Sequence, residues 1–296
     1  MTDTIDHGPP AERYPAGPLP QGYTRVLDHG WVGLVDVMGD DRRIVDAARL
    51  SVSGEQVRAV SDDEALIRYL MRHRHTSPFE FGELVFDMKM PMFTARQWVR
   101  HRTASISEMS ARYGVLPEEF YVPQVEDIQT QSTANRQGRG VDPVNGVMHR
   151  DSFEAEAAAC HGRYRARVGD DMARELARIN LPLSTYTRWW WKADLHNIFH
   201  LLSLRLSPHA QMEIRVFAEV VASHVQAKFP ICYRAFEDFR LCSISFSAKE
   251  IAALRSLGIS VDGSFSNETW TKDLFPTKRE REEFVVKVQK LLDFRA

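Results

Sequence analysis

Alternating apolar and polar positions predict two strands in the first third of the chain. Residues 30–39 form a short apolar run bounded by glycines, a pattern that is typical of a strand. From Phe81 to Met90 the even-numbered positions are apolar or glycine, and the odd-numbered positions are mostly polar. This period of two predicts a strand that buries one face, and Pro91 should end it.

Helical periodicity predicts most of the remaining structure. A helix over 42–50 should begin after a cap at Asp40 or Asp41, and a helix over 62–73 should stop before Pro78. The same reasoning predicts helices at 93–102, 151–168, 171–180, 194–205, 208–228 (capped by Ser207), 247–256 and 277–293, with loops at 103–113 and 124–148.

These elements predict an α/β protein with one main domain and two terminal extensions. Residues 1–24 carry prolines and glycines too close together for regular structure, so we expect a flexible tail. Residues 25–242 should form the α/β domain, and residues 243–296 should form a helical C-terminal extension.

Composition narrows the class of protein. The net charge of −2 over 296 residues lacks the basic excess of nucleic-acid binders, so we expect no nucleic-acid partner. Cys160, Cys232 and Cys242 form no CxxC pair, which favours a reducing cytoplasm over a disulfide framework. The first residues do not resemble a secretory signal, and no stretch approaches the ~20 apolar residues of a membrane span. We therefore expect a soluble cytoplasmic protein.

The candidate chemistry is concentrated in residues 97–113, the signature segment. If the helix continues to residue 102, then Gln97, Arg100 and His101 share one face, because residues three and four apart are neighbours on a helix. The loop that follows is rich in hydroxyls and backbone N–H groups. Together with the arginines it suits a phosphate or another anion. These residues alone fit a solvated arginine face with a serine turn equally well.

The spacing within the signature segment resembles that of a known family. Arg100-His101-Arg102, then seven residues, then Ser110 is similar to the signature of the flavin-dependent thymidylate synthases. The longer pattern is present too, as Gln97-Trp98 before it and Arg112-Tyr113 after it. Further resemblance, from about residue 26 to 240, is carried by 30–39, 73–80, 177–183, 186–188, 204–205, 207–211 and 213–214.

The resemblance implies a fold, an activity and an assembly. The fold would be a single domain with a central, mostly antiparallel sheet flanked by helices. The enzyme would methylate dUMP to dTMP, using 5,10-methylenetetrahydrofolate as carbon donor and FAD reduced by NADPH. It would be a homotetramer with shared active sites. Cys232 follows Pro230-Ile231 in a segment that we expect to be helical, and it does not resemble the nucleophile of the cysteine-dependent thymidylate synthases.

The resemblance also assigns residues to roles. Arg205 would activate the uracil ring, since a cation beside O4 and N3 makes C5 more electron-rich. The dUMP-binding residues would be Gln97, Trp98, Val99, Arg100, Glu108, Met109, Ser110, Ala111, Arg112, Arg178 and Arg205. The FAD-binding residues would be Ser77, Arg100, His101, Arg102, Thr103, Glu108, Asp194, Leu195, His196 and His200. No metal is expected.

Other interpretations stay open at this point. His196 and His200 have zinc-ligand spacing and could join His73 and His75, or they could be structural histidines. Many family members carry Asn at the position of Ser107, which leaves room for an enzyme of the same fold that makes another C5-modified pyrimidine nucleotide. A non-catalytic nucleotide- or RNA-binding protein would also use the arginine cluster.

Overall fold

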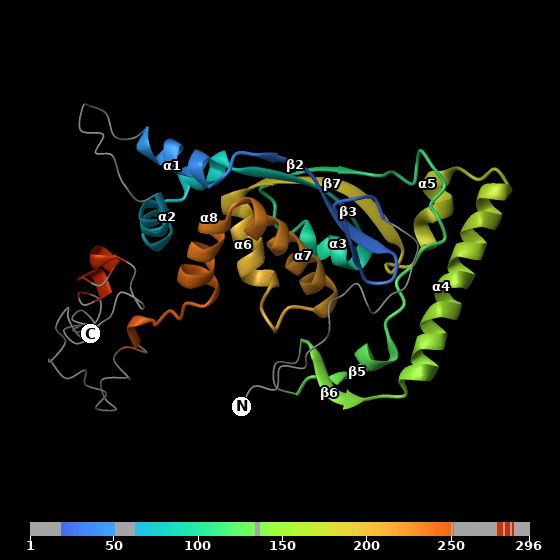
Figure 1. The fold of residues 1–296 in the computed structure, drawn as a ribbon. Helices are drawn as coiled ribbons and strands as arrows, with labels where there is room; N and C mark the ends of the chain where they lie inside the picture. The colour runs from blue at the N-terminus through green and yellow to red at the C-terminus, as the bar shows by residue number, and fades with distance from the viewer. Residues whose placement is uncertain are drawn as a thin grey trace. The chain divides into compact units, whose positions relative to one another are not determined.

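A five-stranded sheet in the order β1-β2-β3-β7-β4 frames the fold in the computed structural model (Figure 1). The structure describes residues 19–50, 63–133, 137–249, 251, 277–280, 282–284 and 286. The strands are β1 (Tyr23–Val26), β2 (Gly30–Met38), β3 (Glu83–Pro91), β7 (Tyr186–Asp194) and β4 (Ser105–Glu108). Each neighbouring pair is antiparallel, as the resemblance implied.

The chain divides into two compact units, Met1–Phe236 and Glu237–Ala296. The helices of the first unit are α1 (Asp41–Arg49), α2 (Asp63–Arg72), α3 (Met92–Trp98), α4 (Gly146–Gly169), α5 (Arg174–Ala177), α6 (Leu195–Arg205), α7 (Met212–Lys228) and α8 (Pro230–Phe236). The 3₁₀ helices in the described part of this unit are η2 (Ser77–Phe81), η3 (Val125–Asp127) and η4 (Arg178–Asn180).

One face of the sheet is packed against α3, α6 and α7 (Figure 1). The even-numbered residues of β3 point to this face, and Phe86 stacks on Trp191 of β7 with ring centroids 6.0 Å apart. Phe86 and Met88 are fully buried. The apolar positions of this strand form the floor of the core, as the alternation predicted. The prediction that only one face is buried holds for the first half of the strand, because Asp87 and Lys89 on the other face are buried as well.

The other face of the sheet carries charge and an exposed aromatic ring. Asp87 is only 1% exposed and accepts hydrogen bonds from Arg188 at 2.9 and 2.6 Å and from the Tyr23 hydroxyl at 2.9 Å. Trp190, which lies two residues after Arg188 in β7, is 52% exposed. Among the described residues of the first unit, no helix covers this face in Figure 1.

The start of α1 confirms its predicted cap. The Asp40 side chain accepts a hydrogen bond from the Arg43 N–H at 3.0 Å. Asp41, the other predicted cap, accepts instead from the N–H groups of Ile231 and Cys232, at 2.8 and 2.9 Å, and so connects α1 to the beginning of α8. The two aspartates therefore satisfy the open N–H groups of two different helices.

Several predicted elements are wrong, and β7 is the longest of the strands that the sequence analysis missed. Residues 186–188 begin strand β7, and the helices predicted at 171–180 and 194–205 left 186–193 without a predicted element. The segment 189–191 is three tryptophans, which hides alternation in the letters, although burial alternates because Trp189 and Trp191 are buried and Trp190 is exposed. Pairing on both sides, with β3 and β4, makes this strand.

The two predicted loops contain strands. Residues 105–108 form β4, which pairs with β7 at the edge of the sheet. Residues 124–148 contain η3, the hairpin of β5 (Gln129–Gln131) and β6 (Arg139–Pro143), and the start of α4. These strands are short and polar, so only their pairing partners reveal them.

Helix boundaries also differ from the predictions. The helix predicted at 171–180 is shortened to α5 followed by η4. The helix predicted to start at Pro208 starts at Met212, because the chain bends at 206–210 first. The strand predicted from Phe81 starts at Glu83, since Phe81 ends η2. Tyr23 and Thr24, which were predicted to belong to the tail, are in β1.

In the second unit, a π-helical turn (η5, Glu237–Leu241) is followed by helical residues at 248–249, 251 and 278–286 in part. Most of the helix predicted at 247–256 and part of that predicted at 277–293 lie outside the described residues, as do residues 1–18 of the predicted tail.

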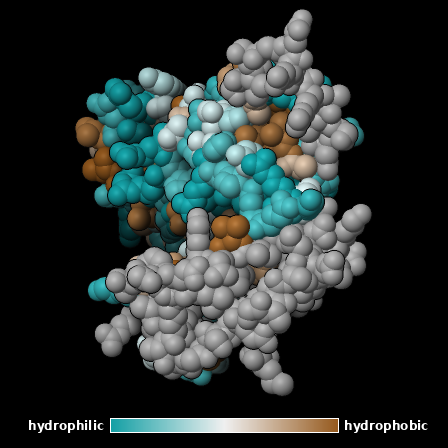
Figure 2. All heavy atoms as spheres, turned by 90° about the vertical axis from the view of Figure 1, so that its left-hand side faces the viewer, coloured by the Kyte–Doolittle hydropathy of each residue, from teal (hydrophilic) through white to brown (hydrophobic). Residues whose placement is uncertain are grey.

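On the face shown in Figure 2, the described surface is mostly hydrophilic with small separate apolar patches. None of the described helices is long and apolar enough to cross a membrane.

Candidate active site

The signature segment begins in a helix and continues as a turn and an edge strand. Helix α3 ends at Trp98, whose fully buried indole packs edge-on against Trp191 at 5.4 Å. Arg100 and His101 follow in a turn in which the His101 N–H donates to the Trp98 carbonyl at 3.1 Å. The predicted shared helix face of Gln97, Arg100 and His101 is therefore wrong, since α3 ends at Trp98, after Gln97 but before Arg100 and His101.

His101 and Arg205 meet although 104 positions separate them in the chain. Arg205, the last residue of α6, donates from Nε to Nε2 of His101 at 3.1 Å. The His101 ring also lies edge-on to His200, with centroids 5.7 Å apart. Burial, followed by the charges of Arg205 and His200, lowers the pKa of His101 from 6.5 to about 4. His101 is therefore neutral near pH 7 and accepts the bond from Arg205.

The loop after β4 is held by the neighbouring strand. The Thr187 hydroxyl donates to the Glu108 carboxylate at 2.5 Å, and the Met109 N–H donates to the Arg188 carbonyl at 2.9 Å. Immediately beyond, the Ser110 hydroxyl oxygen accepts from the Arg112 N–H at 3.3 Å. Ser110 thus stabilises a tight turn of backbone, which is the geometry in which successive N–H groups can hold an anion.

Two of the arginines expected to bind phosphate lie near α5. Arg112 forms an ion pair with Glu175 at 3.1 Å, and both side chains are more than half exposed. Arg178 begins η4 directly after α5. Exposed ion pairs contribute little to stability, so Arg112 can exchange Glu175 for a phosphate group at small cost.

The residues expected to contact FAD lie mostly on the surface of the chain. Arg100, Arg102, Thr103, His200 and Ser77 are exposed, and His196 is half-buried. Two members of the set have structural partners. Asp194 caps α6 by accepting from the Asn197 N–H at 2.9 Å and from its side-chain amide at 2.7 Å. Leu195 is fully buried and donates its N–H to Gly82 at 2.8 Å.

A hydrogen-bonded network beside Gln97 was missed by the sequence analysis. The Gln97 amide nitrogen donates to the Gln211 carbonyl oxygen, and the Gln211 amide nitrogen donates to Glu213 at 2.9 Å. Glu213 is 2% exposed and also accepts from Arg139 and from the Tyr121 hydroxyl, the latter at 3.1 Å. The sequence feature that could have indicated this network is Glu213, an acid at a position of the predicted helix that faces the core, since a buried carboxylate needs hydrogen-bond partners.

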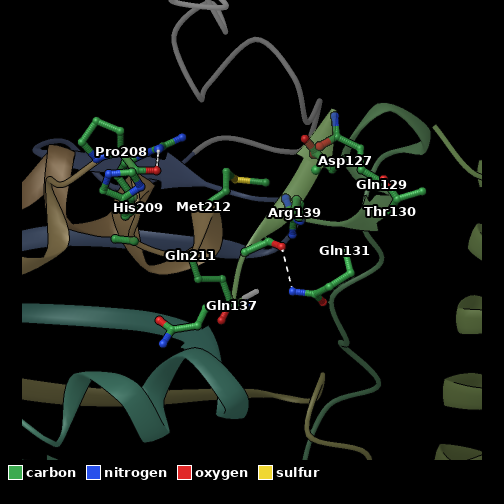
Figure 3. A pocket seen from close by; sticks show the side chains of 14 residues that line it. Asp127, Gln129, Thr130, Gln131, Gln137, Arg139, Pro208, His209, Gln211 and Met212 are labelled. Carbon is green, nitrogen blue, oxygen red and sulfur yellow. Dashed lines mark hydrogen bonds between the residues drawn. The ribbon is translucent and has the colours of Figure 1, made fainter. Parts of the chain in front are cut away.

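Gln211 also lies on the rim of a pocket of about 450 Å³ between the β5–β6 hairpin and residues 208–212 (Figure 3). Arg139 lies on the hairpin side of the pocket and His209 on the other side. Burial lowers the pKa of Arg139, but the charge of Glu213 outweighs burial and the pKa is raised overall. The ion pair between Arg139 and Glu213 therefore holds the β5–β6 hairpin against the start of α7.

No candidate metal site is found in the described part of the chain, and Cys232 lies in an environment that disfavours its thiolate. No group of three or more His, Cys, Asp or Glu side chains there could hold a metal ion. Cys232 is fully buried, and burial, together with the neighbouring Asp41, raises the pKa of its thiol well above the usual value. A thiol in this environment is a poor nucleophile because the thiolate is the reactive form.

Comparisons with known proteins identify the family of the chain. Residues 33–231 match the family model described as thymidylate synthase complementing protein. The flavin-dependent thymidylate synthase of Treponema pallidum is 49% identical over 245 residues, which is 80% of both chains. That of Ruegeria pomeroyi is 48% identical over 238 residues, 78% of each chain.

A solved structure shares the fold as well. The UMP/dUMP methylase PolB from Streptomyces cacaoi, bound with 5-Br dUMP, aligns with a TM-score of 0.67 and 32% identity. The alignment covers 74% of this chain and 99% of PolB. Matches of this breadth define the class of protein, an enzyme of nucleotide methylation. The chain belongs to the flavin-dependent thymidylate synthase family.

Proposed function

We propose that this chain converts dUMP to dTMP and that Arg205 activates the uracil ring. As a member of its family the chain is an FAD-dependent methyltransferase. The observation that carries the assignment of Arg205 is its hydrogen bond to neutral His101 within the signature segment. That bond fixes the guanidinium without neutralising its charge, so it can stabilise negative charge that develops on O4 and N3 of uracil.

Phosphate recognition is assigned to the loop 108–112 with Arg100, Arg112 and Arg178. The tight turn at Ser110 and the exchangeable ion pair of Arg112 support this role. Guanidinium groups and backbone N–H groups are the donors that a phosphate dianion prefers. Ser110 acts by shaping the loop and contacting substrate, and its hydroxyl oxygen accepts a hydrogen bond from the backbone N–H of Arg112.

Flavin binding is assigned to the exposed residues around His101. Arg100, Arg102 and Thr103 offer the charged and hydroxyl donors that fit the phosphates and ribityl chain of FAD, while His101 and His200 offer ring faces. When bound, FAD supplies the reducing equivalents that turn a transferred one-carbon unit into a methyl group. NADPH would reduce it, and 5,10-methylenetetrahydrofolate would supply the carbon.

A partner subunit would complete the flavin site. Most of the proposed flavin contacts are exposed in the single chain, whereas a cofactor site normally encloses most of its ligand. The face of the sheet that carries the 52% exposed Trp190 offers a surface for a second copy. We therefore propose a homotetramer with shared active sites. The three free cysteines support a reducing, cytoplasmic location.

The test is a product assay on the flavin-loaded protein. The purified protein should be yellow and, given NADPH, 5,10-methylenetetrahydrofolate and dUMP, should form dTMP identified by mass. Arg205→Ala should abolish product. Arg234→Ala, which removes an exposed arginine on α8, serves as the matched control and should keep full activity. A yellow protein whose Arg205→Ala variant still makes dTMP would refute the role of Arg205.

A second candidate function differs only in the product. The solved structure with 32% identity is that of a UMP/dUMP methylase, so UMP deserves the same assay as dUMP. Methylation of UMP, or a product other than dTMP from dUMP, would make the protein an enzyme of the same fold with a different nucleotide product. A colourless protein that leaves dUMP unchanged would refute both functions.

A further inference from the structure

Glu213 is the most completely buried acid beside the proposed substrate site. It is the second residue of α7 and is 2% exposed. Three donors from separate parts of the chain converge on its carboxylate: Arg139, the Tyr121 hydroxyl at 3.1 Å, and the Gln211 amide nitrogen at 2.9 Å. A buried charge with this many partners is costly to remove from its network.

The charge of Glu213 sets the direction of the hydrogen bonds that lead to Gln97. An ionised carboxylate accepts hydrogen bonds and cannot donate them. Gln211 must therefore turn its NH₂ group toward Glu213, which leaves its carbonyl oxygen to face Gln97. That oxygen can only accept, so Gln97 must turn its own NH₂ group toward Gln211.

We propose that Glu213 is a positioning residue that fixes the Gln97 amide with its carbonyl oxygen toward the nucleotide. The inference rests on the proposed function, in which Gln97 contacts dUMP. The site would then read a hydrogen-bond donor on the nucleotide at this point. In dUMP that donor is either the N3–H of uracil or the 3′-hydroxyl of the sugar.

A purely structural role for Glu213 makes a different prediction. Its ion pair with Arg139 also holds the β5–β6 hairpin, so loss of the carboxylate would lower stability in either case. Only the positioning role predicts that the variant loses its ability to distinguish nucleotides with a donor from nucleotides without one. This selectivity is the readout that separates the two roles.

The experiment measures dissociation constants on the full-length, flavin-loaded protein by isothermal titration calorimetry. The ligands are dUMP, N3-methyl-dUMP, in which a methyl group replaces the N3 hydrogen, and 2′,3′-dideoxy-UMP, which lacks the 3′-hydroxyl. The hydrogen bonds from Gln97 to Gln211 and from Gln211 to Glu213 are called the relay. The first variant is Glu213→Gln, whose amide can donate as well as accept and so no longer fixes the direction of these hydrogen bonds. The second is Gln211→Leu, which removes the relay at an exposed position. Tyr121→Phe is the control, because it removes one donor from the same carboxylate and leaves the relay intact.

The wild-type protein should bind one of the two analogues at least ~10-fold more weakly than dUMP, since one neutral hydrogen bond is worth about a factor of ten. The weaker analogue identifies the donor that is read. Glu213→Gln and Gln211→Leu should reduce this gap to about 3-fold or less, and Tyr121→Phe should preserve it.

Three results would overturn the inference. These are equal wild-type binding of all three nucleotides, a gap that both relay variants retain, and a gap that Tyr121→Phe closes as fully as they do. If Glu213→Gln does not fold, Gln211→Leu alone decides between these outcomes. Absence of dUMP binding by the wild-type protein would instead refute the proposed function on which the inference rests.

Discussion

The hydrogen bond between Arg205 and His101 predicts a difference between two similar substitutions. The acceptor is Nε2, the ring nitrogen further from the backbone, at 3.1 Å from Nε of Arg205. In His101→Gln the side-chain oxygen can reach the position of Nε2. In His101→Asn the oxygen lies near the position of Nδ1 and falls short. Both variants are neutral amides, so they differ mainly in the reach of the acceptor.

The size of the effect follows from the type of bond. Hydrogen bonds to charged groups contribute about 1.5–3 kcal/mol when buried. Since His101 is only half-buried, we take about 1.4 kcal/mol, which corresponds to roughly a tenfold change in rate. His101→Asn should therefore lower kcat about tenfold, and His101→Gln should stay within about threefold of wild type.

The assay is the rate of dTMP formation at saturating dUMP, divided by the flavin content of each preparation. This correction matters because His101 is also a proposed flavin contact. Activity of His101→Asn equal to or above that of His101→Gln would refute the idea that a distant acceptor positions Arg205. Equal losses in the two variants would show that the ring itself, rather than Nε2, is what the site requires.

Three other predictions follow from the structure. Arg188→Leu leaves the buried carboxylate of Asp87 without its cation and should lower the free energy of unfolding by about 3 kcal/mol in urea titrations. Arg234→Leu, at an exposed ion pair, should lower it by less than about 1 kcal/mol. Equal losses in the two variants would contradict this prediction. Trp190→Glu places a charge on the exposed sheet face and should reduce the particle mass measured by light scattering, and an unchanged mass would exclude this face from the assembly. The pKa of His101 is lowered from 6.5 to about 4, so the unfolded chain binds this proton more readily between those values and stability falls as the pH drops through that window. Half-burial reduces the contribution to about 1 kcal/mol between pH 7 and pH 5, which His101→Gln should remove from the urea unfolding curves.

Local patterns in the sequence were enough for the elements whose signals are short in range. The alternation at 81–90 predicted which side of β3 is buried, and Asp40 marked the start of α1. The signature segment was found by residue spacing alone, and the family that it resembles was confirmed by the comparisons. These features depend on residues a few positions apart, so no tertiary contact is needed to recognise them.

Other local predictions failed where a distant partner decides the structure. Nothing between residues 92 and 102 forbids a continuous helix, yet α3 ends at Trp98, whose ring packs against Trp191. β7 carries three consecutive tryptophans, and its strand character comes from pairing with β3 and β4. The energy of such contacts belongs to pairs of elements and is invisible to any window of neighbouring residues.

The sequence by itself determined the family, the central sheet strand β3 and the candidate site residues. Only the tertiary structure decided which of them touch. His101 meets Arg205 over 104 positions, and Gln97 meets Gln211 over 114. Burial, with the charges of Arg205 and His200, lowers the pKa of His101, and the Gln97 amide nitrogen points to Gln211. Charge and hydrogen-bond direction are set by the groups that surround a side chain, and folding alone brings those groups together.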